Sequence, residues 1–185
     1  VATHLQNQRS QIGEIGECFC GAESAKYELN RRKMAKRTIL QLGDPTLRKV
    51  SRPVKDFDSH LWTLLDDMWE TLLACEGLGL AAPQVGILKR AVVIDYEDKR
   101  YEMINPEILE VSGESIDNEG CLSVQGFRGL VKRPKYVKVR YFDRHGGKTE
   151  LEGNDYFARC ILHELDHLEG VLFVDKMIRK IPDED

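Results

Sequence analysis

No stretch of this 185-residue sequence comes close to about eighteen consecutive apolar residues, so the sequence predicts no membrane-spanning helix. Residues 1–33 also lack the apolar centre of a secretory signal peptide. Blocks of basic residues are missing too, and the formal net charge is −4, which argues against a role in reading nucleic acid. We therefore expect a soluble, cytoplasmic protein that works away from membranes.

The sequence has too few cysteines, too irregularly spaced, for a disulfide framework. There are five: Cys18, Cys20, Cys75, Cys121 and Cys160. An odd number without a repeating interval does not match a set of paired bridges. A reducing compartment fits better, and there a thiolate can serve as a metal ligand.

Composition predicts one globular domain preceded by a dissimilar extension. Apolar residues make up 42% of the chain and charged residues 31%, as in ordinary folded domains. Residues 1–33 are polar and lack helical or strand periodicity, and Met34 has the character of a natural start. We expect residues 1–33 to be an extension outside the core and residues 34–185 to form the functional domain.

Hydrophobic periodicity predicts an α+β fold. A helix begins near Asp58 or Ser59, carries a broad apolar stripe and ends at Gly77, and a second is bounded by Asn154 and Gly170. Short strands are predicted at residues 90–96, 100–104, 107–111, 136–142, 148–151 and 172–174. Their spacing suits hairpins, so we expect short antiparallel strands packed around a central second helix, with the first helix N-terminal to them.

That second helix carries His163-Glu164-Leu165-Asp166-His167. Two histidines four residues apart lie on one helix face and can bind one metal ion. Glu164 is rotated by about 100° from His163 and can flank the ion as a general acid or base. The alternative is a half-exposed polar helix face without metal.

A third ligand must come from elsewhere in the chain. Phe173 stands where a metzincin would have its third histidine, and 18 residues after His167 leave little room for a glutamate-bearing helix of the thermolysin type. Cys121, on a turn-prone segment that interrupts the strand pattern, remains as a candidate. The alternative for Cys121 is an inert buried thiol.

A glycine-rich stretch, Gly77-Leu78-Gly79-Leu80-Ala81-Ala82-Pro83-Gln84, follows the first helix. It has no Lys-Ser/Thr pair and no third glycine at dinucleotide spacing, so it is not a phosphate loop. The Gln84 amide could donate a hydrogen bond to a developing oxyanion. A plain helix-to-strand turn is the alternative.

Taken together, residues 77–84, Glu119-Gly120-Cys121-Leu122-Ser123 and residues 163–167 resemble the three ordered motifs of the peptide deformylases. The resemblance covers residue 34 to about residue 175. It implies a hydrolase that removes the formyl group from the N-terminal formyl-methionine of newly made polypeptides, by way of a metal-bound water. Its partners would be those nascent chains, together with a transient contact with the ribosome.

The resemblance also implies a role for each motif residue. Cys121, His163 and His167 would bind Fe²⁺, for which Zn²⁺ or Ni²⁺ can substitute, and Glu164 would be the general acid/base. The oxyanion would be held by Gln84 and the backbone N–H of Leu122. Substrate contacts are expected from Leu78, Gly79, Glu119, Gly120 and Ile161, with Leu78 and Ile161 lining an apolar slot for methionine.

Two rival functions remain open from the sequence. A zinc endopeptidase is disfavoured by Phe173 and by the cysteine ligand. A catalytically silent metal-binding protein would not need Glu164 and Gln84 together. The sequence also ends without the long basic C-terminal helix that some deformylases use on the ribosome, which puts docking by that route in doubt.

We predict that a chain starting at Met34 keeps its melting temperature and its activity, because residues 1–33 have no core-forming periodicity. Thermal unfolding of the full and shortened chains, with a hydrolysis assay on both, checks this. A clear fall in the melting temperature of the shortened chain would show that the extension packs on the domain.

Overall fold

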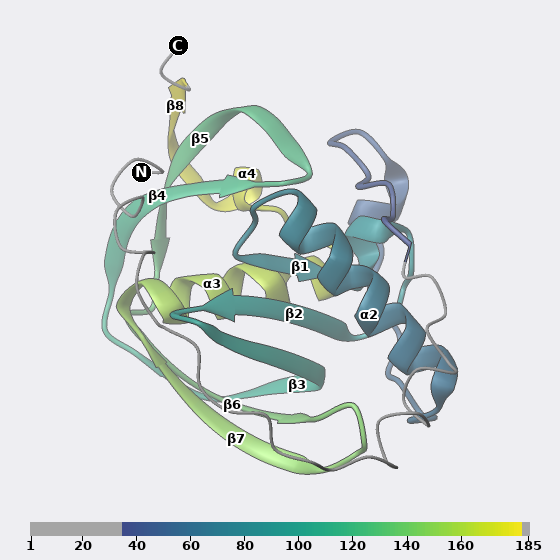
Figure 1. The fold of residues 1–185 in the computed structure, drawn as a ribbon. Helices are drawn as coiled ribbons and strands as arrows, with labels where there is room; N and C mark the ends of the chain where they lie inside the picture. The colour runs from purple at the N-terminus through teal and green to yellow at the C-terminus, as the bar shows by residue number, and fades with distance from the viewer. Residues whose placement is uncertain (1–34, 183–185) are drawn as a thin grey trace, which may run out of the picture. The chain divides into compact units, whose positions relative to one another are not determined.

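The computed structural model describes residues 35–182, which form two antiparallel sheets and two long helices (Figure 1). The prediction that residues 1–33 are an extension falls outside the described residues. The larger sheet contains β1 (Gly79–Ala81), β2 (Ala91–Tyr96), β3 (Lys99–Ser112), β6 (Tyr136–Phe142) and β7 (Lys148–Asn154), paired in the order β1-β2-β3-β6-β7. The smaller sheet contains β4 (Ser115–Cys121), β5 (Val124–Arg133) and β8 (Met177–Pro182), paired in the order β4-β5-β8.

The helices are α2 (Ser59–Ala74), α3 (Asp155–Leu168) and the short α4 (Phe173–Lys176), with 3₁₀ turns η2 (Pro45–Arg48) and η3 (Ala82–Val85). The predicted α+β class, with antiparallel strands around a central histidine-bearing helix, is confirmed. Within residues 35–182, no helix is both long enough and apolar enough to cross a membrane.

The two long helices cover opposite faces of the larger sheet (Figure 1). Ala91 and Val93 of β2 join the core beneath α2, whereas Val92 and Ile94 join the core beneath α3. Successive strand residues point to opposite faces, so a strand covered on both sides must be apolar throughout. This explains the continuous apolar run of β2, and it fixes α3 against the sheet as a rigid support.

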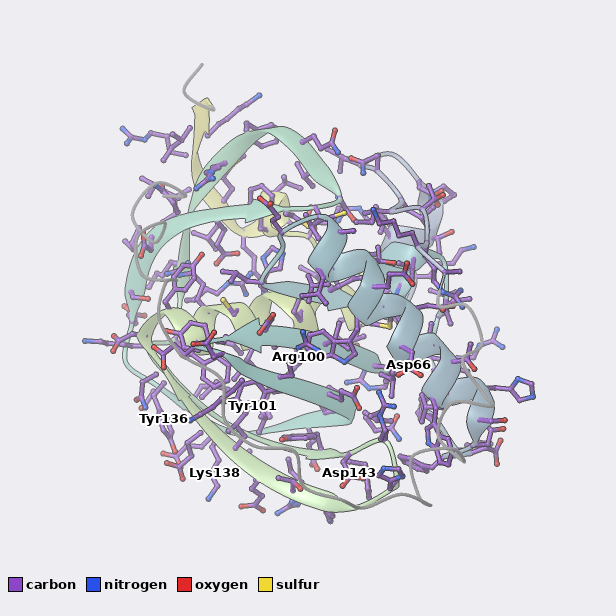
Figure 2. All side chains as sticks on the ribbon, in the orientation of Figure 1. Asp66, Arg100, Tyr101, Tyr136, Lys138 and Asp143 are labelled. Atoms are coloured by element: carbon purple, nitrogen blue, oxygen red, sulfur yellow. The ribbon has the colours of Figure 1, made fainter. Side chains whose placement is uncertain are left out.

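Strand β6 shows the alternating pattern that the sequence predicts. Val137, Val139 and Tyr141 are buried against α3. Tyr136 and Lys138 alternate with them along the strand and are only partly buried at the outer surface (Figure 2). This strand therefore has one face in the core and one facing solvent, as its alternation requires.

Helix α3 ends as its sequence predicts. Gly170 has a φ of 71°, and its N–H donates to the carbonyl of His167, while the N–H of Val171 donates to the carbonyl of Asp166. These two bonds form a Schellman motif, which favours glycine at the left-handed position. At the other end Asn154 is the N-cap, although its side chain makes no capping bond among the described residues.

The end of helix α2 differs from the prediction. The left-handed residue is Glu76, with a φ of 51°, and Gly77 follows it. Glycine is required at position 77 by close packing rather than by a left-handed backbone. A Cβ there would lie 2.7 Å from a methyl carbon of Leu72 and 2.9 Å from a methyl carbon of Leu122. The missing side chain lets the turn after α2 approach the loop that follows Cys121.

Two local predictions are wrong. The strands expected at residues 100–104 and 107–111 are one strand, β3, whose pairing with β6 shifts register between Ile104 and Glu107. Asn105 lies at this shift, and its side-chain amide exchanges two 2.8 Å hydrogen bonds with the backbone of Val54. Residues 172–174 form the start of α4 rather than a strand, because Asp175 accepts a hydrogen bond from the N–H of Leu172. Cys121 ends strand β4 just after a register shift in its pairing with β5, and Leu122 and Ser123 form the turn that follows, as the turn-prone segment predicted.

Candidate metal centre and active site

Three side chains from two elements converge between the sheets. Cys121, His163 and His167 each offer one ligand atom, and the three atoms lie within 4.8 Å of one another. The Sγ of Cys121 is 3.3 Å from Nε2 of His167. The sequence predicted this set, and the structure brings all three residues together.

These residues fit a transition-metal ion. Ligands at about 2.0–2.3 Å in a tetrahedral arrangement would be roughly 3.5 Å apart, close to the separation of Sγ and Nε2. Two imidazoles and one thiolate suit Fe²⁺, Zn²⁺ or Ni²⁺ and leave a fourth position for water. Burial lowers the pKa of His167 well below its ordinary value, which keeps the ring neutral as a ligand must be.

Glu119 holds the first histidine from behind. Oε2 of Glu119 lies 2.9 Å from Nδ1 of His163. Burial alone would raise the pKa of Glu119, but hydrogen bonds from His163 and Arg133 outweigh it and hold that pKa at about 2. Because Nδ1 of His163 is bound to this ionised carboxylate, Nε2 is the ring nitrogen that would face the ion.

This placement corrects the sequence expectation for Glu119. We expected it to contact substrate, but its carboxylate is directed into the interior and only 5% of the residue is exposed. Glu119 still borders the cleft, as does neighbouring Gly120. The side chain therefore acts on the histidine rather than on a substrate.

Glu164 lies at the wall of the same cleft, beside Gly79. A Cβ on Gly79 would come within 2.7 Å of the carboxyl carbon of Glu164, so only glycine fits there. Among the described residues, Oε2 of Glu164 has no hydrogen-bond partner, although it is buried. Burial raises the pKa of Glu164 to about 7, although the positive charges of His163 and Arg133 act to lower it. Such a carboxyl group can both accept and release a proton near neutral pH.

Gln84 is fixed by three contacts. Its Oε1 accepts the N–H of Ala81 at 2.8 Å, and its Nε2 donates to Oγ of Ser123 at 3.1 Å. Nε2 also lies 3.5 Å from Sγ of Cys121. The first two bonds hold the amide, so that its remaining N–H is directed at the metal side of the cleft.

The cleft has a volume of about 510 Å³, within the range of pockets that hold small ligands. Leu78 is 43% exposed at its edge, and Gly79, Gly120 and Leu122 border it. Residues that the sequence reasoning missed also line it: Phe127, Arg128, Tyr156, Arg159 and Cys160. Helical spacing could have found the last two, because they lie four and three residues before His163.

Ile161 is a wrong prediction. It is fully buried in the core between α3 and the larger sheet and does not border the cleft. The reason is helix geometry. Ile161 precedes His163 by two residues, which corresponds to about 200° around the helix axis, so Ile161 lies on the opposite face from His163.

Phe173 has a structural role beside the centre. Its ring packs against His163, with ring centroids 6.2 Å apart and planes 26° from parallel. The two histidine rings are 5.0 Å apart and nearly perpendicular. The residue that excluded a third histidine in the sequence thus restricts the rotation of the first one.

A Cys-His-His set with two buried histidines, an adjacent carboxyl group and a fixed amide is typical of a metal-dependent hydrolase. The family model for polypeptide deformylase matches residues 36–182. A peptide deformylase from Caldanaerobacter subterraneus is 55% identical over 152 residues, which cover 82% of this chain and 96% of that protein. The chain belongs to the polypeptide deformylase family, whose members remove N-formyl groups.

Solved structures agree with this assignment. The peptide deformylase from Thermotoga maritima superimposes with a TM-score of 0.76 at 41% identity, covering 78% of this chain and 99% of that one. A peptide deformylase from Acinetobacter baumannii, solved with Met-Ala-Ser bound, gives a TM-score of 0.74 at 36% identity, covering 78% and 99%.

We predict that Cys121→Ser loses metal and activity together, because a neutral hydroxyl is a poor replacement for a thiolate. Metal analysis and turnover on the same preparation check this. Cys75→Ser, at an exposed free thiol, is the matched control and should change neither. Full metal occupancy in the Cys121 variant would contradict the assignment of the third ligand.

Proposed function

We propose that this chain removes the formyl group from the N-terminal formyl-methionine of newly made polypeptides, with Glu164 as the general acid/base. The observation that carries the proposal is the position of Glu164: a buried carboxyl group with a raised pKa beside three convergent metal ligands. A silent metal-binding protein would have no use for a carboxyl group held in this way.

When bound, the metal ion would polarise the formyl carbonyl and lower the pKa of a water molecule towards 7. The other requirements fall to the chain. Glu164 would take the proton from the attacking water and pass it to the departing amino nitrogen of methionine. The position of Glu164 beside Gly79 at the cleft wall supports this role.

Two donors would stabilise the oxyanion. One is the Nε2 N–H of Gln84, which the bonds to Ala81 and Ser123 hold in place. The other is the backbone N–H of Leu122, directly after the ligand Cys121. A fixed donor of this kind contributes about 2.7–4 kcal/mol to transition-state stabilisation. A thiolate ligand makes the ion a milder Lewis acid, so these donors matter more.

The peptide would lie along the cleft past Leu78, Gly79 and Gly120. Gly79 and Gly120 have no side chains, which lets a substrate backbone approach closely. Leu78 offers apolar surface at the edge for the methionine side chain. Tyr156 and Cys160 would complete the slot in place of Ile161. The peptide Met-Ala-Ser bound to the Acinetobacter relative is of this class of molecule and supports the proposal.

We place the reaction in the cytoplasm, where formylated chains are made and where a thiolate ligand is kept reduced. The enzyme would meet its substrate at the ribosome through a transient contact. The experiment that tests the activity compares formyl-Met-Ala with the same peptide carrying an acetyl group and with unformylated peptides of similar length. Release of formate alone supports the proposal, and cleavage of internal peptide bonds would favour an endopeptidase.

Glu164→Gln should retain metal but lose roughly 10²-fold or more in turnover, because general acid/base catalysis contributes about that much. Glu169→Gln, near the exposed end of the same helix, is the matched control and should turn over normally. Steady-state rates with metal analysis separate the effects. Normal turnover by the Glu164 variant would show that another group moves the proton.

The native metal is proposed to be Fe²⁺. Divalent affinity favours zinc over iron, so protein purified in air should contain Zn²⁺ or Ni²⁺, whereas anaerobic Fe²⁺ reconstitution should give faster turnover. Air should inactivate the iron form, since Fe²⁺ and the Cys121 sulfur can both be oxidised. Matched iron, nickel and zinc forms are assayed before and after exposure to air. If the iron and zinc forms turn over at equal rates and air changes neither, the proposal that Fe²⁺ is the native metal is wrong. The proposed deformylase activity would still stand.

A further inference from the structure

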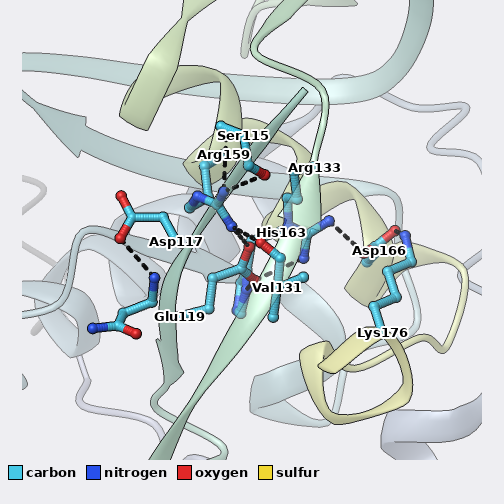
Figure 3. Close-up of polar contacts among 10 residues, drawn as sticks. Ser115, Asp117, Glu119, Val131, Arg133, Arg159, His163, Asp166 and Lys176 are labelled. Atoms are coloured by element: carbon cyan, nitrogen blue, oxygen red, sulfur yellow. Dashed lines mark hydrogen bonds and ion pairs between the residues drawn. The ribbon is translucent and has the colours of Figure 1, made fainter. Parts of the chain in front are cut away.

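A buried arginine one turn before the first histidine has no place in the mechanism described so far. Arg159 lies on α3 and is only 2% exposed. Its Nη1 donates to Oε1 of Glu119 at 2.7 Å and to the carbonyl of Val131 at 2.9 Å. Its Nη2 donates to the carbonyl and hydroxyl oxygens of Ser115 at 3.1 and 3.0 Å. One guanidinium thus joins α3 to both β4 and β5 (Figure 3).

The carboxylate of Glu119 is enclosed by donors. Oε1 accepts from Arg133 and Arg159, and Oε2 accepts from Arg133 and His163. Figure 3 shows the guanidinium of Arg159 and the ring of His163 approaching this carboxylate from the same helix. Arg159 and His163 are four residues apart and therefore share a helix face. The helix contacts the carboxylate at two points, one through each oxygen.

Arg133 bonds both oxygens of this carboxylate but also has a second acidic partner. Its guanidinium is shared with Asp166, at 2.8 Å, and Asp166 is in turn bound by Lys176 at 2.7 Å. Arg133 therefore ties Glu119 to a second carboxylate near the protein surface. Within residues 35–182, Glu119 is the only charged partner of Arg159, and its other acceptors are neutral.

Stability alone is a weak reason to bury Arg159. Taking a guanidinium out of water is costly, and buried ion pairs often add little net stability over apolar residues of similar volume. What four short hydrogen bonds do supply is a fixed geometry. The orientation of Glu119 in turn sets the ring and tautomer of His163.

We propose that Arg159 is a positioning residue for the metal centre, holding Glu119 in the orientation that presents Nε2 of His163 to the ion. The inference rests on the proposed function only in taking His163 as a metal ligand. Arg159 touches neither ion nor reacting atoms. Its signal in the sequence is an arginine four residues before the first histidine of the metal-binding pair.

The test uses Co²⁺ as a probe, because its affinity and its absorption spectrum both report on the ligands. Metal-free preparations of the wild-type chain, Arg159→Met, Arg159→Lys and Ser115→Ala are titrated with Co²⁺. Loss of a residue that orients a metal ligand typically costs about 10–100-fold in metal affinity, so Arg159→Met should bind Co²⁺ that much more weakly, with a changed spectrum. Lysine can keep one contact with Glu119, and its affinity should fall between those of methionine and arginine.

Ser115→Ala is the matched control. It removes one acceptor of Arg159 and weakens the tie to β4, but leaves Glu119 untouched. Its Co²⁺ affinity should stay within about twofold of wild type, with the same spectrum. A purely structural role for Arg159 predicts instead a lower melting temperature with unchanged Co²⁺ binding in Arg159→Met. That result would overturn the proposal, as would a lysine variant no better than the methionine variant.

Arg159→Gln replaces Arg159→Met if the methionine variant fails to fold, because its amide can still serve some buried polar neighbours. The same criterion applies to it: wild-type Co²⁺ affinity and spectrum would overturn the proposal. Formate release from formyl-Met-Ala is measured on the wild-type chain in parallel. Its absence would refute the proposed activity, while the Co²⁺ comparison would still decide the role of Arg159.

Discussion

Buried polar side chains on a helix need partners in the protein interior, and Glu119 supplies them for Arg159 and His163 of α3. That carboxylate comes from the smaller sheet and accepts hydrogen bonds from Arg159 and His163 of the helix and from Arg133 of β5. The apolar side of α3 is buried against the larger sheet. The helix is therefore held by hydrophobic packing on one side and by ionic contacts on the other, and the metal ligands lie on the ionic side.

Close approach is the second requirement, and missing side chains provide it. Gly79 leaves room for Glu164, and Gly77 leaves room for Leu72 and Leu122. Each contact joins the stretch after α2 to a different part of the centre: Gly79 contacts helix α3, and Gly77 contacts the loop after Cys121. The glycine-rich stretch is thus neither a phosphate loop nor a simple turn, since its glycines are explained by the particular side chains that pack against them.

Much of this could be predicted from sequence because the signals are local. Helical spacing places His163 and His167 on one face, alternation describes β6, and Gly170 marks the end of α3. The partners of Glu119 could not be found in this way, because Arg133 and Arg159 lie on other elements and only the fold brings them together. The error at Ile161 was avoidable, since its spacing from His163 already places it on the opposite helix face. The start of α4 was missed because residues 172–174 have a strand preference. A hydrogen bond from the N–H of Leu172 to the Asp175 carboxylate favours the helical turn instead.

The origin of the third ligand has a physical consequence. A third histidine further along the chain would have come from the region just after α3, whereas Cys121 comes from the end of β4 in the smaller sheet. A metal ion held by Cys121 and the two histidines would therefore bridge the smaller sheet and the helix that rests on the larger one. Because binding free energy adds to the stability of whatever arrangement holds the ligands together, such an ion would favour the joined state of the two sheets. Glu119 links the same two parts through its own bonds to Arg159 and His163, so the carboxylate and the ion would act on the same junction.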